Sequence, residues 1–382
     1  MSEQTYREEP TIDFERQKSA KSYARSKRWL FLIELGLGGI YILAFLVSNF
    51  SFLLRDIAFS LSSNRIIVVA VYFIVFYFVY TALTFPFSVF GGYVLPQRYG
   101  LSTQTFGGWL SDWAKSLAIG VVIAGAGVEI AYYLLEVIPG LWWLIMGVIV
   151  LLFTVVLANL GPVLLVPLFY KMVPLENESL AQKLIRLAEK ANAKVKGVYR
   201  LNLSSKTTAA NAALMGLGNT RRIVLGDTLL DRYTEDEIES VFAHELGHHV
   251  HSDIVKLITI QSALTLVGLY IASYVLKRFA SAPPFTAPSD IASLPLLALT
   301  IGVVSLLALP LGNGLSRLFE HQADEYALES TGNPRAFRNA MVRLANQNLA
   351  ELDPGALVEF WMYDHPAIGK RIALAEHFER KH

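Results

Sequence analysis

Two histidines and a glutamate in the segment VFAHELGHHVHSD (241–253) have the spacing of a metal-dependent hydrolase. His244 and His248 are four residues apart, so on a helix both imidazoles project from one face and can bind the same ion. Glu245 is rotated by about 100° from His244 on that helix, so it can reach a zinc-bound water without binding the metal. This H-E-x-x-H pattern predicts a zinc ion that lowers the pKa of a water and a glutamate that takes the proton.

A catalytic zinc usually has three protein ligands and one water, so one further ligand is expected. The segment SRLFEHQADEYAL (316–328) holds the candidate, Glu320. Asp324 lies one helical turn later on the same face and is predicted to orient a ligand histidine through its second ring nitrogen. His249 and His251 fall off the ligand face and are predicted to be solvated or to lie behind the ligands. The alternative is a pair of polar helices that hold no metal.

Short elements must hold these residues in place. A helix is predicted over 234–251, where Thr234 is the N-cap and Glu237 completes a capping box. The periodicity of residues 177–193 predicts an amphipathic helix, and VYRLNL (198–203) and RRIVLG (221–226) predict short strands. The two polar segments that contain these elements, 171–253 and 317–382, are expected to pack together as one catalytic domain.

The composition places this domain beside a membrane. The 382 residues are 53% hydrophobic and 17% charged, against about 25% charged in a soluble chain. Six stretches are long and apolar enough to span a bilayer, about 29–50, 66–92, 117–138, 141–170, 254–277 and 291–316. Residues 49–63 are a candidate for a seventh span. The expected fold is mainly α: a polytopic α-helical membrane protein with six or seven transmembrane helices and a zincin-type metalloprotease domain containing a small β-sheet.

Three parts of the chain are predicted from this pattern. They are a cytoplasmic tail (1–28), a transmembrane region of four spans with a loop at 93–116 (29–170), and a zinc metalloprotease domain interrupted by two spans (171–382). The tail carries five basic residues just before the first span, Lys18, Lys21, Arg25, Lys27 and Arg28. The excess of basic residues predicts that the tail, and with it the catalytic domain, lies on the cytoplasmic side. Lys277 and Arg278, on the opposite side, argue against this orientation.

Other classes of function are excluded by composition. The chain has no cysteine, which removes disulfides, thiolate metal sites and cysteine nucleophiles. A formal net charge of +1 argues against a nucleic-acid partner, because such domains usually carry a strong basic excess. The expected partners are the lipid bilayer and a peptide or protein substrate.

Longer stretches of the chain resemble a known family. HELGH (244–248) and SRLFEHQAD (316–324) resemble the integral-membrane zinc metalloproteases of the gluzincin type. The resemblance to the type I CAAX prenyl protease family extends to YVLPQRYGLSTQTFGGWLSDWAKS (93–116), NAALMGLGNTRRIVLGDTLL (211–230) and HPAIGKRI (365–372). It covers the chain from about residue 60 to 375. It implies an endopeptidase with one zinc ion per chain, and a substrate with a prenylated C-terminus from which a tripeptide is removed.

The resemblance also implies roles for residues outside the metal site. Asn211 and Ala212 would lie on an edge strand that pairs with the substrate backbone. His365 and Arg371 would face the scissile carbonyl and stabilise its developing negative charge; otherwise Arg371 would neutralise the acidic helix. The chain departs from the family pattern at Ala213 and Leu214, where prenyl proteases usually have an aromatic residue. It departs again at Tyr363-Asp364, where the family has a small hydroxyl residue before the histidine.

Two other functions remain open from the sequence. The heat-shock membrane proteases, which are shorter chains, share the zinc motif. A broad role in membrane-protein quality control is therefore an alternative. A different class, a non-proteolytic membrane scaffold with a structural zinc, would need a fourth protein ligand, and only three good ones are visible.

Overall fold

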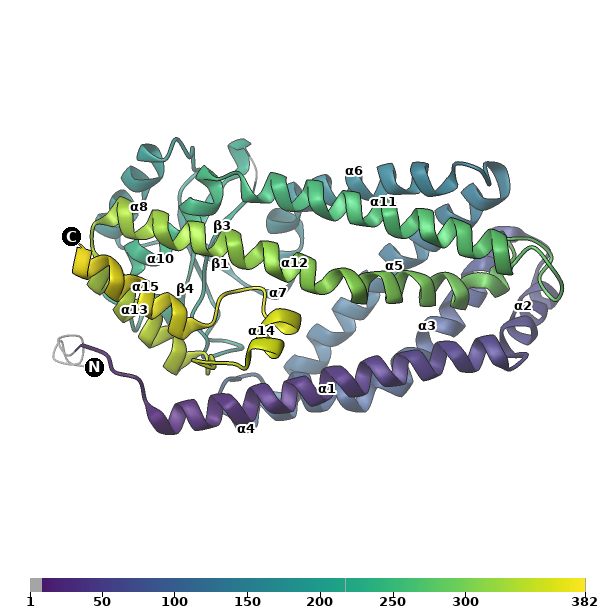
Figure 1. Cartoon of the computed structure of the whole chain (residues 1–382), viewed down its shortest axis with the longest axis horizontal. Coiled ribbons are helices and arrows are strands. Elements are labelled where there is room, and N and C mark those ends of the chain that lie inside the picture. Colours follow the sequence, from purple (N-terminus) through teal and green to yellow (C-terminus); the bar gives the residue numbers. More distant parts are fainter. Residues whose placement is uncertain (1–8, 217, 382) are drawn as a thin grey trace.

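The structure is a computed structural model that describes residues 9–216 and 218–381. The first eight residues of the predicted cytoplasmic tail lie outside these ranges. Long helices fill one end of the elongated molecule, and the sheet and shorter helices fill the other (Figure 1). The long-helix part consists of α1 (Phe14–Val47), α2 (Phe50–Leu61), α3 (Arg65–Val89), the π-helix η2 (Phe90–Val94), α4 (Leu95–Arg98), α5 (Phe106–Val137), α6 (Trp142–Leu164), α7 (Val166–Phe169), α11 (Asp253–Phe279), η4 (Ile291–Ser293) and α12 (Leu294–Thr331).

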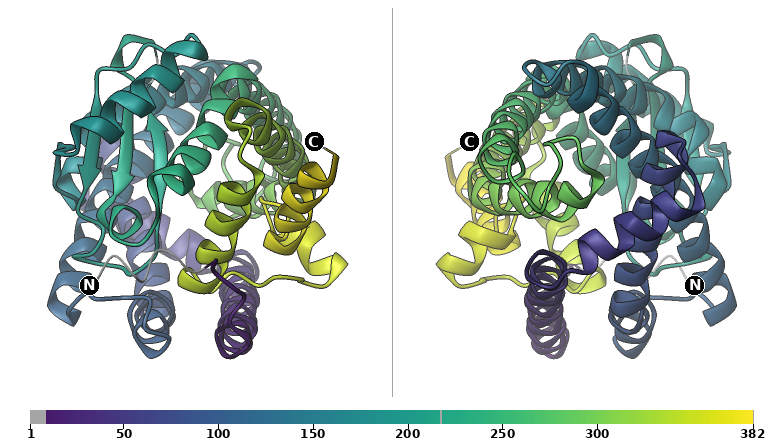
Figure 2. Two further views of the ribbon diagram at one scale, coloured as in Figure 1. Left: turned by 90° about the vertical axis from the view of Figure 1, so that its left-hand side faces the viewer. Right: turned by 90° about the vertical axis from the view of Figure 1, so that its right-hand side faces the viewer.

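Within the described ranges, six helices are long and apolar enough to cross a membrane, which confirms the six expected spans. They belong to α1, α3, α5, α6, α11 and α12. Seen along the long axis, they are arranged in a ring (Figure 2). The candidate seventh span at 49–63 is a separate helix, α2, of only 12 residues. At 1.5 Å per residue it is about 18 Å long, too short to cross a bilayer alone.

A buried polar network joins α2 to the end of the bundle that is remote from the sheet. The Ser51 hydroxyl lies 2.6 Å from the Tyr72 hydroxyl and donates to the Ala292 carbonyl at 2.6 Å. Arg55 forms an ion pair with Asp290, whose side chain is 1% exposed, at 2.7 Å. Because buried charges require partners, this pair fixes α2 against the connection between α11 and α12.

The other end of the molecule holds the sheet. Its elements are β1 (Met172–Pro174), α8 (Glu178–Lys190), β2 (Val198–Leu201), β3 (Ala212–Met215), the short 3-10 helix η3 (Gly218–Thr220), β4 (Arg222–Gly226), α9 (Asp227–Leu230), α10 (Glu235–Val250), α13 (Pro334–Gln347), α14 (Ala356–Met362) and α15 (Ile368–Lys381). The strand order is β1-β2-β4-β3. The β2–β4 pair is parallel, and the two outer pairs are antiparallel. β3 is therefore an edge strand.

The predicted local elements are close to the observed ones. α10 begins after Thr234, which caps the Glu237 backbone N–H while the Glu237 side chain accepts from the Thr234 N–H. α8 begins after its N-cap Asn177. α10 packs closely against α12, because Gly247 has no side chain: a Cβ at this position would lie 2.8 Å from the Cα of Ala323.

Two boundaries differ from the sequence prediction. α1 begins at Phe14, inside the segment expected to be tail, because this end of the helix is bound to the C-terminal half; the Gln17 amide donates to the Ala350 carbonyl at 3.0 Å. α12 does not end with its apolar residues near 316. It continues to Thr331 and carries Glu320 and Asp324 on the same helix as the sixth span.

Candidate metal centre and catalytic site

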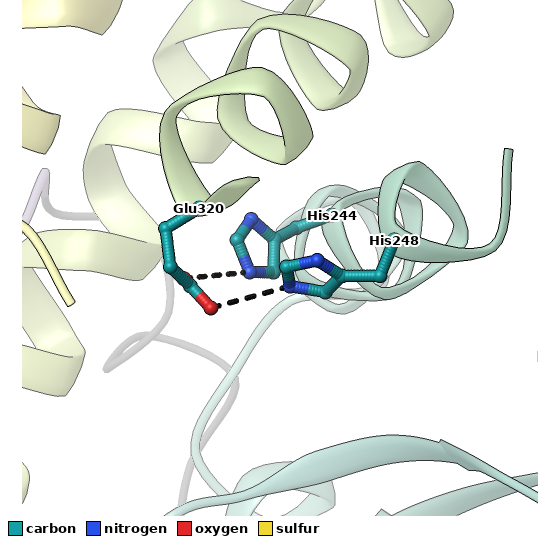
Figure 3. Close-up of side chains that lie close together, drawn as sticks. All are labelled: His244, His248 and Glu320. Carbon is teal, nitrogen blue, oxygen red and sulfur yellow. Dashed lines mark ion pairs between the residues drawn. The ribbon is translucent and has the colours of Figure 1, made fainter. Parts of the chain in front are cut away.

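The two motif histidines and Glu320 meet at the contact between α10 and α12. The Nε2 atom of His244 lies 3.2 Å from Oε2 of Glu320, and Nε2 of His248 lies 3.3 Å from Oε1. Figure 3 shows both imidazole rings facing the carboxylate. One ligand atom from each of the three residues lies within 4.8 Å of the others. The structure therefore brings together the three residues predicted as metal ligands, from segments more than 70 residues apart in the chain.

This cluster fits a tetrahedral metal ion. Ligand atoms about 2.1 Å from a tetrahedral zinc ion are about 3.4 Å from one another, close to the two separations given above. Oε2 of Glu320 is buried and has no hydrogen-bond partner among the described residues. A buried carboxylate oxygen that accepts no hydrogen bond and whose only polar contact among the described residues is Nε2 of His244 is costly, and a bound cation would satisfy it. Two nitrogens and one carboxylate oxygen are a donor set typical of zinc.

The second nitrogen of each histidine faces a buried carboxylate. Nδ1 of His244 lies 2.8 Å from Oδ1 of Asp324, as the sequence predicted for Asp324. Nδ1 of His248 lies 3.0 Å from Oδ2 of Asp253, a residue for which the sequence predicted no role. Each contact lets Nδ1–H donate to the carboxylate and leaves Nε2 free to bind a metal. Both carboxylate side chains are at most 2% exposed.

Arg371 of α15 approaches His244 from the side of Asp324. Its Nε donates to Oδ2 of Asp324 at 2.8 Å, and its Nη2 donates to Oδ1 at 2.6 Å. Nη2 is also 3.2 Å from Nδ1 of His244. The Nε and Nη2 groups of the guanidinium thus bind both oxygens of Asp324, an arrangement that balances the charge of the acidic helix.

Glu245 lies between the metal-ligand cluster and the edge strand. It lines a cavity of about 300 Å³ together with His248, Glu320 and Leu214. Burial raises the pKa of the Glu245 carboxyl, while the nearby histidines and the Leu214 backbone N–H oppose the shift. A carboxylate whose pKa is moved toward neutrality is suited to take a proton from water and return it later.

His365 reaches the same carboxylate from the C-terminal segment. Its Nε2 lies 3.2 Å from Oε1 of Glu320, and its Nδ1 lies 2.8 Å from Oδ1 of Asp364. The contact with Asp364 raises the pKa of the His365 imidazole. The His365 side chain is 54% exposed, so this side of the site is open.

The edge strand β3 places its free backbone groups beside Glu245. The Gly226 N–H donates to the Asn211 carbonyl, so the backbone of Asn211 is directed toward β4. Backbone groups alternate in direction along an antiparallel strand, so Ala212 and Leu214 present theirs to the open edge. The Leu214 backbone N–H lies near enough to Glu245 to lower the pKa of its carboxyl, which agrees with this alternation. Of the two predicted substrate-binding residues, Ala212 has the suitable backbone direction, and the side chain of Asn211 is exposed.

Comparison with known proteins identifies this arrangement. Residues 174–379 match the family model of peptidase family M48, and residues 7–171 match the model described as the CAAX prenyl protease N-terminal region with five membrane helices. The chain belongs to peptidase family M48. Over the described part of residues 7–171 the structure has four span-length helices and the 12-residue α2. The chain is thus a membrane metalloprotease.

Individual relatives cover most of this M48 peptidase. The uncharacterized metalloprotease YhfN of Bacillus subtilis is 32% identical over 94% of the chain and 84% of its own length. The probable CAAX prenyl protease 1 of Schizosaccharomyces pombe is 28% identical over 75% of the chain and 61% of its own length. The crystal structure of S. mikatae Ste24p matches with a TM-score of 0.82 at 22% identity, over 97% of this chain and 93% of that one. This last likeness confirms the fold.

The remaining histidines of the motif segment lie outside the metal-ligand cluster of the M48 peptidase. His249 lines the cavity beside Glu245, and burial lowers the pKa of its imidazole. His251 lies edge-on to the Tyr326 ring, 6.2 Å between centroids. Neither belongs to the three-residue group that can hold a metal. Among the described residues that contact the two histidines, Asp253 is the one for which the sequence predicted no role. It follows the end of the motif helix, so no spacing rule connects it to His248.

Proposed function

We propose that this M48 protease is a zinc-dependent endopeptidase that cleaves peptide bonds at the membrane surface. The observation that carries the proposal is the convergence of His244, His248 and Glu320, with Glu245 beside them in one cavity. The two nitrogens and one oxygen, their separations and the buried oxygen that accepts no hydrogen bond from the described residues support zinc as the metal. One ion per chain is proposed.

The chain's own residues would divide the reaction between them. A bound zinc ion would supply a Lewis acid that polarises the scissile carbonyl and makes water acidic. Glu245 would take a proton from the attacking water and pass it to the leaving amine, since its carboxyl lies in the cavity and burial raises its pKa. Asp324 and Asp253 would hold His244 and His248 in the tautomer that leaves Nε2 free.

The substrate would be held on the opposite side of the cavity from α12. Ala212 would accept and donate backbone hydrogen bonds to an extended peptide, as an added strand on the sheet edge. His365, held by Asp364, would donate to the developing negative charge on the carbonyl oxygen. Its raised pKa favours the protonated form that such a role needs.

The proposed substrate is a protein with a prenylated C-terminus, from which the protease would release three residues. The support is the likeness to several CAAX prenyl proteases, at 23 to 28% identity over more than 70% of the chain. Ala213 and Leu214 stand where those proteases usually have an aromatic residue, and the metalloprotease YhfN is more similar to the chain. A broad role in membrane-protein quality control is therefore the second candidate.

One experiment separates these candidates. The purified protein in lipid nanodiscs is given a farnesylated C-terminal peptide and its unprenylated twin, and the products are identified by mass spectrometry. Cleavage of the farnesylated peptide alone, three residues from its end, would support the prenyl protease. Equal cleavage of both would support the broad endopeptidase. Zinc bound without cleavage of either peptide or of an unfolded membrane protein would contradict both candidate substrates.

The orientation and the division of the chain are proposed as well. We place the N-terminal tail, the metalloprotease domain formed within 171–382 and the C-terminal end on the cytoplasmic side, with 29–170 as the N-terminal transmembrane region. The support is the basic cluster Lys18 to Arg28 and the even number of span-length helices before and after the sheet. The proposed orientation is tested by adding a protease to sealed inverted vesicles, whose cytoplasmic face is outermost. Cleavage within the metalloprotease domain is the expected result.

A further inference from the structure

α14 has its charged and apolar sides reversed relative to a helix that faces water. Its one acidic residue, Glu359, is 8% exposed and points into the protein, where it binds Lys370 at 2.6 Å and accepts the Ala367 N–H at 3.2 Å. Its apolar residues point outward: Leu357 is 78% exposed, Phe360 48% and Trp361 38%. These three are spaced i, i+3 and i+4, so they form one continuous face.

The position of α14 along α12 places this face at the edge of the membrane. The Asn313 amide donates to the Trp361 carbonyl at 2.7 Å, and Arg317 donates to the Glu359 carbonyl at 2.9 Å. From Leu294, where α12 begins, to Asn313 is about 28 Å along the helix axis at 1.5 Å per residue. A bilayer has a hydrocarbon core of about 30 Å. α14 is therefore attached where α12 leaves the hydrocarbon.

Exposed apolar residues also lie on α12 near α14. Leu307, Leu311 and Leu318 are 68%, 54% and 49% exposed and share one side of the helix, about a third of a turn around from the side that Asn313 and Arg317 present to α14. In both views of Figure 2 the yellow C-terminal end of the chain lies at the outer edge of the molecule. Figure 1 shows α14 beside α12 and between it and α1, at the boundary between the long helices and the sheet end.

We propose that the outward face of α14 (Leu357, Phe360 and Trp361) is a membrane-docking surface that lies in the interfacial layer of the bilayer. A large aromatic pair beside aliphatic residues is the composition that this layer favours. Arg317 binds both Glu359 and Tyr363 through their carbonyls, and Tyr363 is two residues before His365. The depth of α14 in the bilayer therefore helps to fix the position of His365 over the metal-ligand cluster.

Site-specific fluorescence tests this contact. Because the chain has no cysteine, Leu357→Cys introduces a single labelling site for an environment-sensitive fluorophore. The full chain is placed, one copy per nanodisc, in phosphatidylcholine with or without lipid that carries a nitroxide near the top of its acyl chain. Leu307→Cys on the apolar part of α12 is the positive control, and Lys190→Cys at the exposed end of α8 is the aqueous control.

The label at position 357 is expected to be quenched by the nitroxide lipid to at least half the extent of the label at 307, while the label at 190 stays unquenched. Phe360→Cys should behave like Leu357→Cys, which guards against a folding defect in one variant. Quenching at 357 and 360 no greater than at 190 would overturn the proposal. A spectral shift that appears only when a peptide is added, or only with two copies per disc, would overturn it as well, in favour of a substrate or of a second copy.

Discussion

Arg371 and Asp324 form a two-pronged ion pair directly behind the ring of His244. The two N–O distances are 2.8 and 2.6 Å, and the Asp324 side chain is 1% exposed. The pair joins α15 to α12 at the metal-ligand cluster. Asp324 thus serves His244 and Arg371 at once, so the last helix of the chain is part of the support of the first metal ligand.

Replacement of Arg371 separates the two roles that the sequence left open for it. Arg371→Gln leaves a buried carboxylate without a counter-charge, which typically costs about 3–5 kcal/mol. Arg371→Lys keeps the positive charge but cannot bind both oxygens of Asp324 with two parallel N–H groups, so an intermediate loss of stability is expected. Thermal unfolding of the two variants, with turnover measured in parallel, checks this. A residue that acted only on the substrate would give a lower kcat at unchanged melting temperature.

Glu245→Gln is expected to keep the bound metal and lose turnover. The amide cannot accept the proton of the attacking water, and general-base catalysis typically contributes about 10²–10⁴ in rate. Metal content by mass spectrometry and peptide turnover are measured on the same sample. Glu239→Gln, on the same helix but paired with Lys183 at 2.8 Å, is the matched control and should keep full activity. Normal turnover in Glu245→Gln would sink the proposed mechanism.

Glu320→Ala should lower zinc affinity, because it removes the only oxygen donor of the three-residue group. The expected result is substoichiometric zinc after dialysis against a weak chelator under conditions where the unchanged protein retains one ion. Glu325→Ala, at an exposed carboxylate five residues further along α12, controls for the loss of negative charge. Unchanged zinc content in Glu320→Ala would remove Glu320 from the ligand set.

The parts of the site that local spacing determines were predictable. The i, i+4 histidines and the capping box at Thr234 follow from helix geometry alone. Local spacing does not predict Glu320 as a ligand. Only the second motif, far along the chain, indicated which acidic residue would meet the histidines. The edge strand was predicted as a segment, but which of its residues direct their backbone outward depends on the register of β3 with β4.

Other features depend on contacts between distant segments. α1 begins at Phe14 because its polar first turns bind the chain near Ala350, which no local pattern in the tail reveals. α12 runs through the end of its apolar stretch because α10 packs against its polar half. The outward apolar face of α14 is visible only once Glu359 is seen to point inward.

Asp253 shows most clearly why the sequence was insufficient. α10 ends at Val250, and Ser252 takes a left-handed backbone conformation with φ of 58°. This turn separates the two helices, and Asp253, the first residue of α11, lies against Nδ1 of His248 at 3.0 Å. A five-residue separation across a helix break has no regular geometry, so no spacing rule connects the two residues.

Asp253→Asn tests whether this contact supports the metal site. The amide is isosteric but neutral, so it makes a weaker acceptor for Nδ1–H and can turn its NH₂ group toward the ring instead. Loss of such a partner typically lowers metal affinity about 10–100-fold.

Zinc affinity is measured by competition with a fluorescent chelator, and Asp236→Asn, on the exposed first turn of α10, is the matched control. Asp253 also binds Lys256 at 3.0 Å, so Lys256→Gln is measured beside it. If Asp253→Asn loses zinc affinity and Lys256→Gln does not, the effect is assigned to the contact with His248. Equal zinc affinities of Asp253→Asn and the unchanged protein would show that this contact does not support the metal site.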